Sequence, residues 1–283
     1  MDKVLWLALA LPAILLAAAL FGAWLWKRFR LRRRLRREPR LRHPIVLAHG
    51  VLGFDQIRLA GRQHVYFRGV PERLRTMGIE VHRPRVPAVA SISLRAERLA
   101  QAVRALPAKK VNLIAHSMGG LDARYAIARL GIADRVASLT TIGTPHFGTP
   151  LADLGMGLLR ITLMGGLRRF FKRLIDLDAL HDLTSQRMIV FNREIPDAPG
   201  TVYISVVGRG DSAGMNPLLW ASHLYLNERA GANDGIVPTA SQRWGEVLRE
   251  VQADHWAQIG WSSSFDAPAF YQDLVRELRG RGF

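Results

Sequence analysis

A serine set between small residues is the feature of this chain with the clearest chemical meaning. The apolar, strand-like run Val111–Gly120 carries Ser117 near its end, and a helix-forming segment follows from Leu121 to Leu130. A strand, a tight turn and a helix in this order form a nucleophile elbow, in which a strained turn exposes the serine hydroxyl. Ala115 stands where the G-x-S-x-G pattern has its first glycine, and Gly119 allows close backbone approach. We interpret Ser117 as a nucleophile; an ordinary strand–helix turn is the alternative.

A second apolar run, Pro44–Asp55, contains the pair His49-Gly50 where its strand would end. Folds that carry a nucleophile elbow take one backbone N–H for the reaction's oxyanion from such a loop. They take the other from the residue after the nucleophile. These donors would be the N–H groups of Val51 and Met118. A plain strand end is the alternative interpretation of the His-Gly pair.

The base that would activate the serine is expected late in the chain, after the acid. His255 follows the strand-like run Glu246–Val251 and precedes the closing helical segment, where a last strand would deliver a general base. Three other histidines, His49, His116 and His146, lie within strand-end motifs. We expect these three to pack or hydrogen-bond locally.

Two aspartates compete for the role of the acid. Asp211 comes just after the strand-like run Thr201–Val207, and Asp234 lies in the tight turn Ala232–Pro238. Topology alone leaves both open.

Several segments together resemble the bacterial triacylglycerol lipases of the Pseudomonas–Burkholderia type. They are Pro44–Asp55, Val111–Gly120, Thr141–Gly148, Leu183–Pro196 and Asn233–Val237. The Ala-His-Ser-Met-Gly-Gly form of the elbow is more similar to Bacillus lipases. The resemblance extends from about Pro44 to Gly260. It implies an α/β-hydrolase fold, with a mostly parallel central sheet flanked by helices, and it implies that the acid is Asp234 of the Asn-Asp-Gly turn.

The chain also departs from that family at its calcium site and its disulfide. The family usually places a calcium-ligating aspartate two residues after the catalytic histidine, and this chain has Ala257 there. Calcium needs several oxygen ligands, so the loss of a carboxylate argues against a bound ion. The chain has 0 cysteines, which excludes disulfides. We expect neither a metal nor a cofactor.

The chain length allows one sizeable catalytic domain behind a separate N-terminal segment. At 283 residues and 49% hydrophobic composition, the chain can bury a single α/β core. Val4–Trp26 is a run of 23 uncharged residues with tryptophans near both ends, long enough to cross a bilayer as a helix. A cleaved signal peptide is the alternative. We expect a transmembrane anchor over residues 1–26, a juxtamembrane segment over 27–43 and a hydrolase domain over 44–283.

The juxtamembrane segment is strongly basic. Residues 27–42 hold ten Lys or Arg and one Glu, and so supply nine of the seventeen net positive charges. This position favours anionic lipid headgroups over nucleic acid, for which a base-reading fold is missing. The positive-inside rule then predicts a single-pass protein of the bacterial inner membrane with its catalytic domain on the cytoplasmic side.

A cap-like insertion is expected between Pro150 and Pro199. Within it, Leu167–Ile175 has apolar residues at helical spacing and Arg or Lys on the other face. This segment would be either a lid that docks on an anionic membrane or an ordinary cap helix.

The function implied by these features is hydrolysis of carboxylic esters, with lipid esters favoured. Ser117 would attack the carbonyl, His255 would transfer the proton and Asp234 would orient the imidazole. The alternatives are acyl transfer by the same triad and a catalytically silent, membrane-bound binding protein.

Overall fold

The computed structural model describes residues 20–24, 26–27, 41–51, 57–59, 62–163, 177–262 and 264–283. The chain divides into two units, residues 1–40 and 41–283. Within the first unit the described residues are helical and exposed. The expected anchor at Val4–Trp26 lies largely outside the described residues, as does most of the basic segment. In the described parts of the chain, no helix is both long and apolar enough to cross a membrane.

The second unit is built on a parallel sheet of six strands in the order β4-β1-β5-β6-β7-β8. Every neighbouring pair in this sheet is parallel. The strands are β1 (Ile45–Ala48), β4 (Val81–His82), β5 (Val111–His116), β6 (Val136–Ile142), β7 (Val202–Arg209) and β8 (Glu246–Gln252). The hairpin β2 (Ile57–Leu59) and β3 (Arg62–His64) stands apart.

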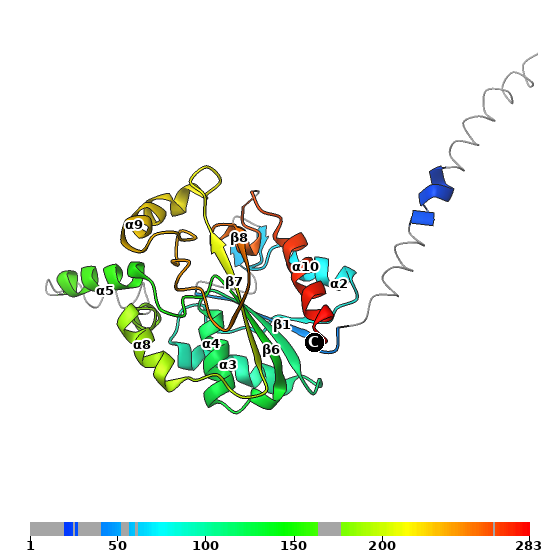
Figure 1. Cartoon of the computed structure of the whole chain (residues 1–283), viewed down its shortest axis with the longest axis horizontal. Coiled ribbons are helices and arrows are strands. Elements are labelled where there is room, and N and C mark those ends of the chain that lie inside the picture. The colour runs from blue at the N-terminus through cyan, green and yellow to red at the C-terminus, as the bar shows by residue number, and fades with distance from the viewer. Residues whose placement is uncertain are drawn as a thin grey trace, which may run out of the picture. The chain divides into compact units, whose positions relative to one another are not determined.

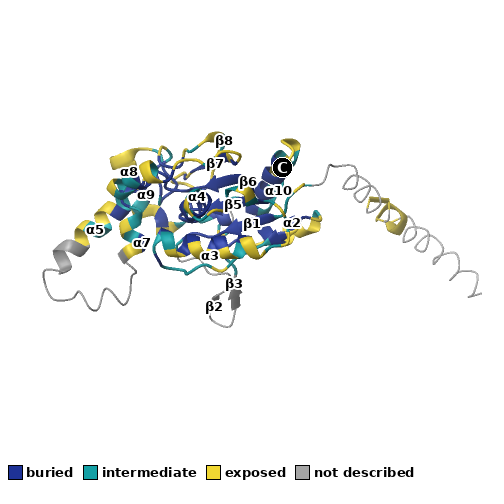
Figure 2. Ribbon diagram, turned by 90° about the horizontal axis from the view of Figure 1, so that it is seen from below, coloured by how far each residue is buried: buried dark blue, intermediate teal, exposed yellow. Residues whose placement is uncertain are grey.

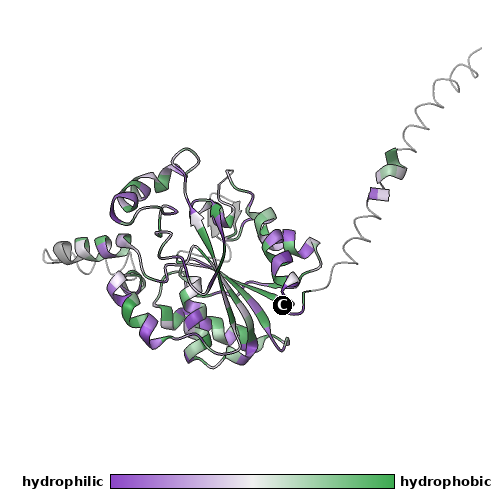
Figure 3. Ribbon diagram, viewed as in Figure 1, coloured by the Kyte–Doolittle hydropathy of each residue, from purple (hydrophilic) through white to green (hydrophobic). Residues whose placement is uncertain are grey.

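Helices cover both faces of the sheet (Figure 1). They are α2 (Val70–Thr76) and α10 (Ala267–Gly280) on one face, and α3 (Ile92–Ala105) and α4 (Gly119–Arg129) on the other. Ile45 and Leu47 of β1 pack toward α10, whereas Val46 packs toward α3. A parallel strand covered on both faces needs apolar residues at successive positions. This requirement explains the buried central strands in Figure 2 and their hydrophobic colour in Figure 3.

A group of helices lies beside the sheet, away from α2 and α10 in Figure 1. It consists of α5 (Pro150–Leu163), α7 (Leu177–Asp182), α8 (Ser185–Glu194) and α9 (Trp220–Ala230). The carboxylate of Asp153 in α5 accepts hydrogen bonds from the backbone and hydroxyl of Ser185. The first three helices fall within the expected insertion between Pro150 and Pro199. The amphipathic segment Leu167–Ile175 lies outside the described residues.

Three short 3-10 helices complete the described elements. They are η1 (Ala133–Arg135), η2 (Pro217–Leu219) and η3 (Ala257–Ile259). The last two flank the strand ends where the candidate site lies, so they bear directly on its shape.

A buried ion pair joins α3 to α4 and to the loop after β1. Arg95 and Asp122 lie 2.8 Å apart with side chains 0% and 1% exposed. The Arg95 guanidinium also donates to the carbonyl of His49 at 2.6 Å. A single residue therefore links two helices to the start of the loop that follows β1.

We expect Arg95→Met to destabilise the fold strongly, because it leaves the Asp122 carboxylate buried without its cation. Breaking such a pair lowers the free energy of unfolding by about 3–5 kcal/mol. Urea unfolding followed by circular dichroism measures the loss. The guanidinium of the exposed Arg98 in the same helix donates to its neighbour Gln101 at 3.2 Å, so Arg98→Met should change stability by less than about 0.5 kcal/mol. Equal small losses in both variants would contradict this account of the pair.

Candidate active site

Ser117 lies in a strained turn between β5 and α4. Its φ of 56° is the one positive value held by a non-glycine residue within the described parts of the chain. Its N–H donates to the carbonyl of Ile142 at 2.9 Å. Its own carbonyl accepts from the hydroxyl of Thr144 at 2.8 Å and from the N–H of Gly120 at 3.0 Å. The expected strand, turn and helix are thus present, and hydrogen bonds on both sides of the serine hold the turn.

The loop after β1 lies directly against this serine. A Cβ on Gly50 would stand 2.6 Å from the Cβ of Ser117 and 3.0 Å from its Oγ, so only glycine fits. The N–H of Gly50 donates to the hydroxyl of Tyr66 at 3.1 Å, and its carbonyl accepts from Nδ1 of His49 at 3.0 Å. The C=O and N–H of a trans peptide point in opposite directions. The bond to His49 therefore fixes the orientation of the Val51 N–H.

Met118 occupies the other expected donor position. It is fully buried and stands at the N-cap of α4, next to Ser117. The N-terminus of a helix carries a partial positive charge and favours an anion. A Cβ on Gly119 would lie 2.7 Å from the carbonyl of Ala48, so the helix start approaches β1 closely.

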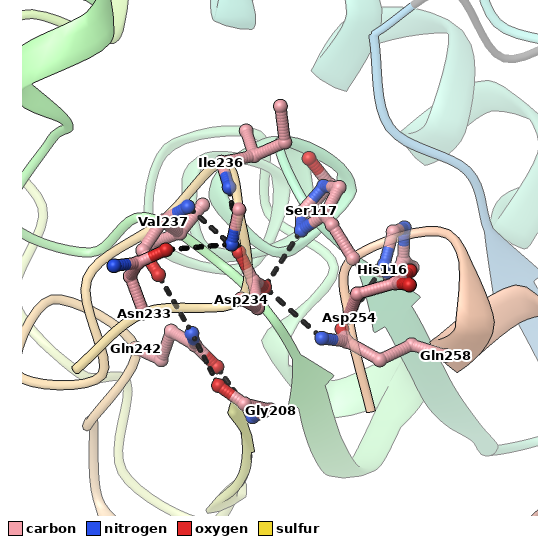
Figure 4. Close-up of polar contacts among 12 residues, drawn as sticks. His116, Ser117, Gly208, Asn233, Asp234, Ile236, Val237, Gln242, Asp254 and Gln258 are labelled. Atoms are coloured by element: carbon pink, nitrogen blue, oxygen red, sulfur yellow. Dashed lines mark hydrogen bonds and ion pairs between the residues drawn. The ribbon is translucent and has the colours of Figure 1, made fainter. Parts of the chain in front are cut away.

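Asp234, which Figure 4 shows among its partners Ile236, Val237 and Gln258, forms a buried pair with His255 at the same end of the sheet. Nδ1 of His255 donates to Oδ2 of Asp234 at 2.8 Å, and Oδ2 also accepts from Nε2 of Gln258 at 3.0 Å. The other oxygen, Oδ1, accepts from the N–H groups of Ile236 at 3.0 Å and Val237 at 2.7 Å. Four donors thus surround a carboxylate that has no exposed surface. The bond at Nδ1 leaves Nε2 of the imidazole to act as a base.

The two candidate acids differ sharply in their surroundings. Asp211 is exposed beyond the end of β7, and its carboxylate accepts from the N–H of Ala213 at 3.3 Å. The structure therefore brings Asp234 to His255 and leaves Asp211 at the surface.

Side chains that the sequence did not single out hold the acid and the base in place. Asn233 accepts from the N–H of Gly235 and from Nδ1 of His223, both at 2.8 Å. Gln242 bonds the backbone of both Gly208 and Val237 and so ties the acid turn to β7. These contacts connect segments far apart in the sequence, and only the Asn-Asp-Gly turn signal pointed to any of them.

Asp254 holds the loop that carries His255 in place in the same way. Its Oδ1 accepts from the N–H groups of Trp256 at 2.9 Å and Ala257 at 2.8 Å, and its Oδ2 accepts from the N–H of Asn216 at 2.9 Å. Ala257, where the resembling family has a calcium ligand, is fully buried. Within the described ranges, no three or more His, Cys, Asp or Glu side chains cluster where they could hold a metal ion.

The strand-end histidines behave differently from one another. His49 bonds the adjacent Gly50, as expected of a local contact, whereas His146 bonds both the nearby Thr141 at 3.1 Å and the distant Arg124 at 3.4 Å. His116 packs in the interior as expected, but its ring bonds are not local, because they join Tyr66 and Gln258, which are distant in the sequence. Burial holds the pKa of His116 well below its usual value, and the nearby His255 lowers it further.

A pocket of about 360 Å³ opens beside the pair. His255 and Asn216 supply polar lining, and the remaining lining residues are Val51, Tyr66, Leu218, Trp256, Ile259 and Trp261. Leu218 is 79% exposed at its mouth. An apolar cavity with one basic nitrogen suits an ester whose acyl or alcohol part is hydrophobic.

Comparison with known proteins agrees with this architecture. A family described as the alpha/beta hydrolase fold matches residues 91–183. Among solved structures, a metagenomic carboxyl esterase superposes with a TM-score of 0.72 at 20% identity, covering 85% of this chain and 76% of the esterase. A Bacillus licheniformis lipase in its mature form gives a TM-score of 0.64 at 22% identity, covering 84% and 94% of the two chains. These structural matches show the fold.

Sequence relatives are closer. A triacylglycerol lipase of Vibrio cholerae is 32% identical, covering 85% of this chain and 89% of that lipase. Triacylglycerol lipase 2 of Saccharomyces cerevisiae is also 32% identical, covering 77% and 74%. A Burkholderia plantarii triacylglycerol lipase is 27% identical, covering 77% and 78%. The chain therefore belongs to the triacylglycerol lipase family of α/β hydrolases, a family of carboxylic ester hydrolases.

Proposed function

We propose that this chain cleaves lipid esters through the triad Ser117, His255 and Asp234 and an acyl-enzyme intermediate. The observation that carries the proposal is the buried 2.8 Å bond between His255 and Asp234, at the sheet edge where Ser117 has its strained φ of 56°. A nucleophile on a tight turn, a base and an orienting acid are the three parts that acyl transfer needs.

The reaction would proceed in two halves. Oγ of Ser117 attacks the ester carbonyl while Nε2 of His255 accepts the hydroxyl proton, and the N–H groups of Val51 and Met118 bind the oxyanion. The tetrahedral intermediate then collapses: the ester C–O bond breaks, and His255 gives its proton to the leaving alcohol. Water adds to the acyl-enzyme by the same route and releases the acid. No cofactor takes part.

The environment of Asp234 supports this assignment of roles. Its carboxylate is held by two backbone N–H groups and the Gln258 amide, none of which carries charge. The charge of Asp234 is therefore available to stabilise the imidazolium that forms on His255.

The proposed substrate class rests on the pocket and on the relatives. Aromatic and aliphatic side chains dominate the lining of the cavity beside His255. The relatives from Vibrio cholerae and Burkholderia plantarii are named triacylglycerol lipases. Transfer of the acyl group to an alcohol instead of water is the alternative outcome for the same acyl-enzyme, and product analysis separates the two.

We also propose that residues 1–26 anchor the enzyme in the bacterial inner membrane, with its catalytic domain on the cytoplasmic side. The support is the uncharged run Val4–Trp26 and the ten basic residues within 27–42. The anchor would hold the active site near lipid esters, and the basic flank would bind anionic headgroups.

Substitution of the triad tests the mechanism. Ser117→Ala and His255→Ala should each abolish turnover of a short soluble ester, and Asp234→Asn should lower kcat about 10³- to 10⁴-fold by misorienting the base. Asp211→Asn is the matched control and should keep nearly full activity. Labelling by a fluorophosphonate should disappear in Ser117→Ala, because the probe bonds to the hydroxyl oxygen of the nucleophilic serine. A larger loss in Asp211→Asn than in Asp234→Asn would refute the acid assignment.

Chelation tests the expectation that no calcium is needed. Activity and melting temperature should be unchanged after incubation with EDTA, because Ala257 offers no carboxylate to an ion at that position. A loss that added calcium restores would overturn this expectation.

Removal of the N-terminal unit tests the anchor. A protein that begins at Leu41 keeps the packing of Leu41 on the core and the bond from Arg42 N–H to the Phe283 carbonyl at 2.9 Å. It should retain kcat on a short soluble ester and lose most turnover of long-chain esters in bilayers, because it no longer stays at the membrane. Vesicle co-sedimentation of the two proteins measures the binding. Equal bilayer activity with and without residues 1–40 would rule the anchor out.

A further inference from the structure

A chain of buried hydrogen bonds joins the loop after β1 to the acid turn. The N–H of Gly50 meets the Tyr66 hydroxyl at 3.1 Å, and that hydroxyl meets Nδ1 of His116 at 2.8 Å. Nε2 of His116 then meets Oε1 of Gln258 at 3.2 Å, and Nε2 of Gln258 donates to Oδ2 of Asp234 at 3.0 Å. The expected oxyanion loop and the expected acid are thus linked by three side chains.

The directions of these hydrogen bonds are set from the Asp234 end. A carboxylate can only accept, so the Gln258 amide turns its nitrogen to Asp234 and its oxygen to His116. An amide oxygen can only accept, so Nε2 of His116 carries a proton and donates it to Gln258. Nδ1 of a neutral His116 is then an acceptor, so the Tyr66 hydroxyl donates to Nδ1 while its oxygen accepts from the N–H of Gly50.

Burial keeps the two titratable members of the chain neutral. Tyr66 is 8% exposed and His116 is 0% exposed. Burial raises the pKa of Tyr66 far above its usual value and lowers that of His116 well below it. Because His116 stays neutral, the proton taken from Ser117 rests on His255, whose ring centroid lies 4.5 Å from that of His116.

The fold leaves a slot for the Gln258 amide. Gly143 follows β6 and Gly208 lies near the end of β7, and a Cβ on either residue would overlap the amide group of Gln258. Glycine at both positions lets a fully buried side chain pass between two strand ends to reach Asp234. The amide fits this slot closely, and its Oε1 and Nε2 atoms make the bonds to His116 and Asp234.

We propose that Tyr66, His116 and Gln258 are positioning residues that hold the Gly50–Val51 loop and the Asp234 carboxylate in register with each other. This inference rests on the proposed function, since it assigns the loop to the oxyanion and Asp234 to the base. The Tyr66 hydroxyl and the His49 ring together fix the peptides on both sides of Gly50. At the other end, Gln258 and His255 bond the same carboxylate oxygen. A shift at one end is therefore carried to the other through these three side chains.

A double-mutant cycle on the full-length protein in detergent tests the coupling. Tyr66→Phe keeps the ring that lines the pocket and removes the hydroxyl, and Gln258→Met keeps the length and removes the amide. Each should lower kcat on a short soluble ester about tenfold while KM changes less than about twofold, because the loss concerns the transition state. Tyr66 and Gln258 do not bond each other directly. If they act through one chain, the double variant should lose about tenfold in total, whereas independent effects would multiply to about a hundredfold.

Tyr271→Phe is the matched control for the loss of a buried hydroxyl. Tyr271 is fully buried in the same core cluster as Tyr66, and its hydroxyl has no hydrogen-bond partner in the described structure. Its removal should leave kcat unchanged. A tenfold loss in this variant would show that the effect of Tyr66→Phe is one of core packing, and it would overturn the proposal.

The result separates this proposal from the proposed function. If Ser117→Ala stays active and keeps fluorophosphonate labelling, the triad itself is wrong. If Ser117→Ala is inactive but the losses in kcat from Tyr66→Phe and Gln258→Met multiply, the proposed coupling through His116 fails and the triad stands. The same conclusion follows if the two substitutions change KM alone. Should Gln258→Met not fold, His116→Gln takes its place in the cycle, since its amide can still donate to Gln258 but offers no acceptor at the Nδ1 position. Tyr66→Phe added to that variant should cost less than about twofold, and a further tenfold loss would refute the coupling.

Discussion

The backbone of Ser117 is the constraint around which the rest of the site is arranged. A non-glycine residue at positive φ costs about 1–3 kcal/mol, so it persists only where its surroundings hold it. Here the N–H is tied to Ile142 at the end of β6, and the carbonyl is tied to Thr144 beyond it. Gly50 packs on the other side of the serine, where any larger residue would collide with it. The strained turn is therefore a product of three strand ends, and it could not form from the elbow sequence alone.

The parallel sheet supplies those strand ends. In an open parallel sheet, binding groups gather outside the carboxyl ends of the strands. The His-Gly loop follows β1, the serine follows β5, the acid turn lies between β7 and β8, and the histidine loop follows β8. Each loop contributes one part of the proposed chemistry, and the helices behind the sheet keep the strands in register. The buried pair of Arg95 and Asp122 extends that support to the carbonyl of His49.

Features that depend on a short sequence motif could be predicted from the sequence. Contacts between segments that are far apart in the sequence could not. The elbow around Ser117 and the apolar strand before His49 were recognised because each is encoded within about ten neighbouring residues. Asp211 and Asp234 both follow β7, so strand order alone leaves both open, and only the resemblance of the Asn-Asp-Gly turn to known lipases implies Asp234. His116 packs as the sequence predicts, but its hydrogen bonds join two distant segments that only the fold brings together. Tyr66 and Gln258 belong to no motif, so only the structure could reveal their contacts.

The chemistry of the side chains around Asp234 explains why they are polar and uncharged. An arginine or lysine in the place of Gln258 would neutralise the carboxylate before the reaction begins. The extra stabilisation that Asp234 gives to the imidazolium of His255 would then be smaller, and only interactions that strengthen in the transition state accelerate the chemical step. An apolar residue there would leave a lone pair of the buried carboxylate without a hydrogen-bond donor, which would destabilise the folded protein. An amide satisfies the lone pair and leaves the charge in place. The same reasoning applies to His116, because a second cation 4.5 Å from the ring of His255 would oppose the proton transfer in the proposed triad.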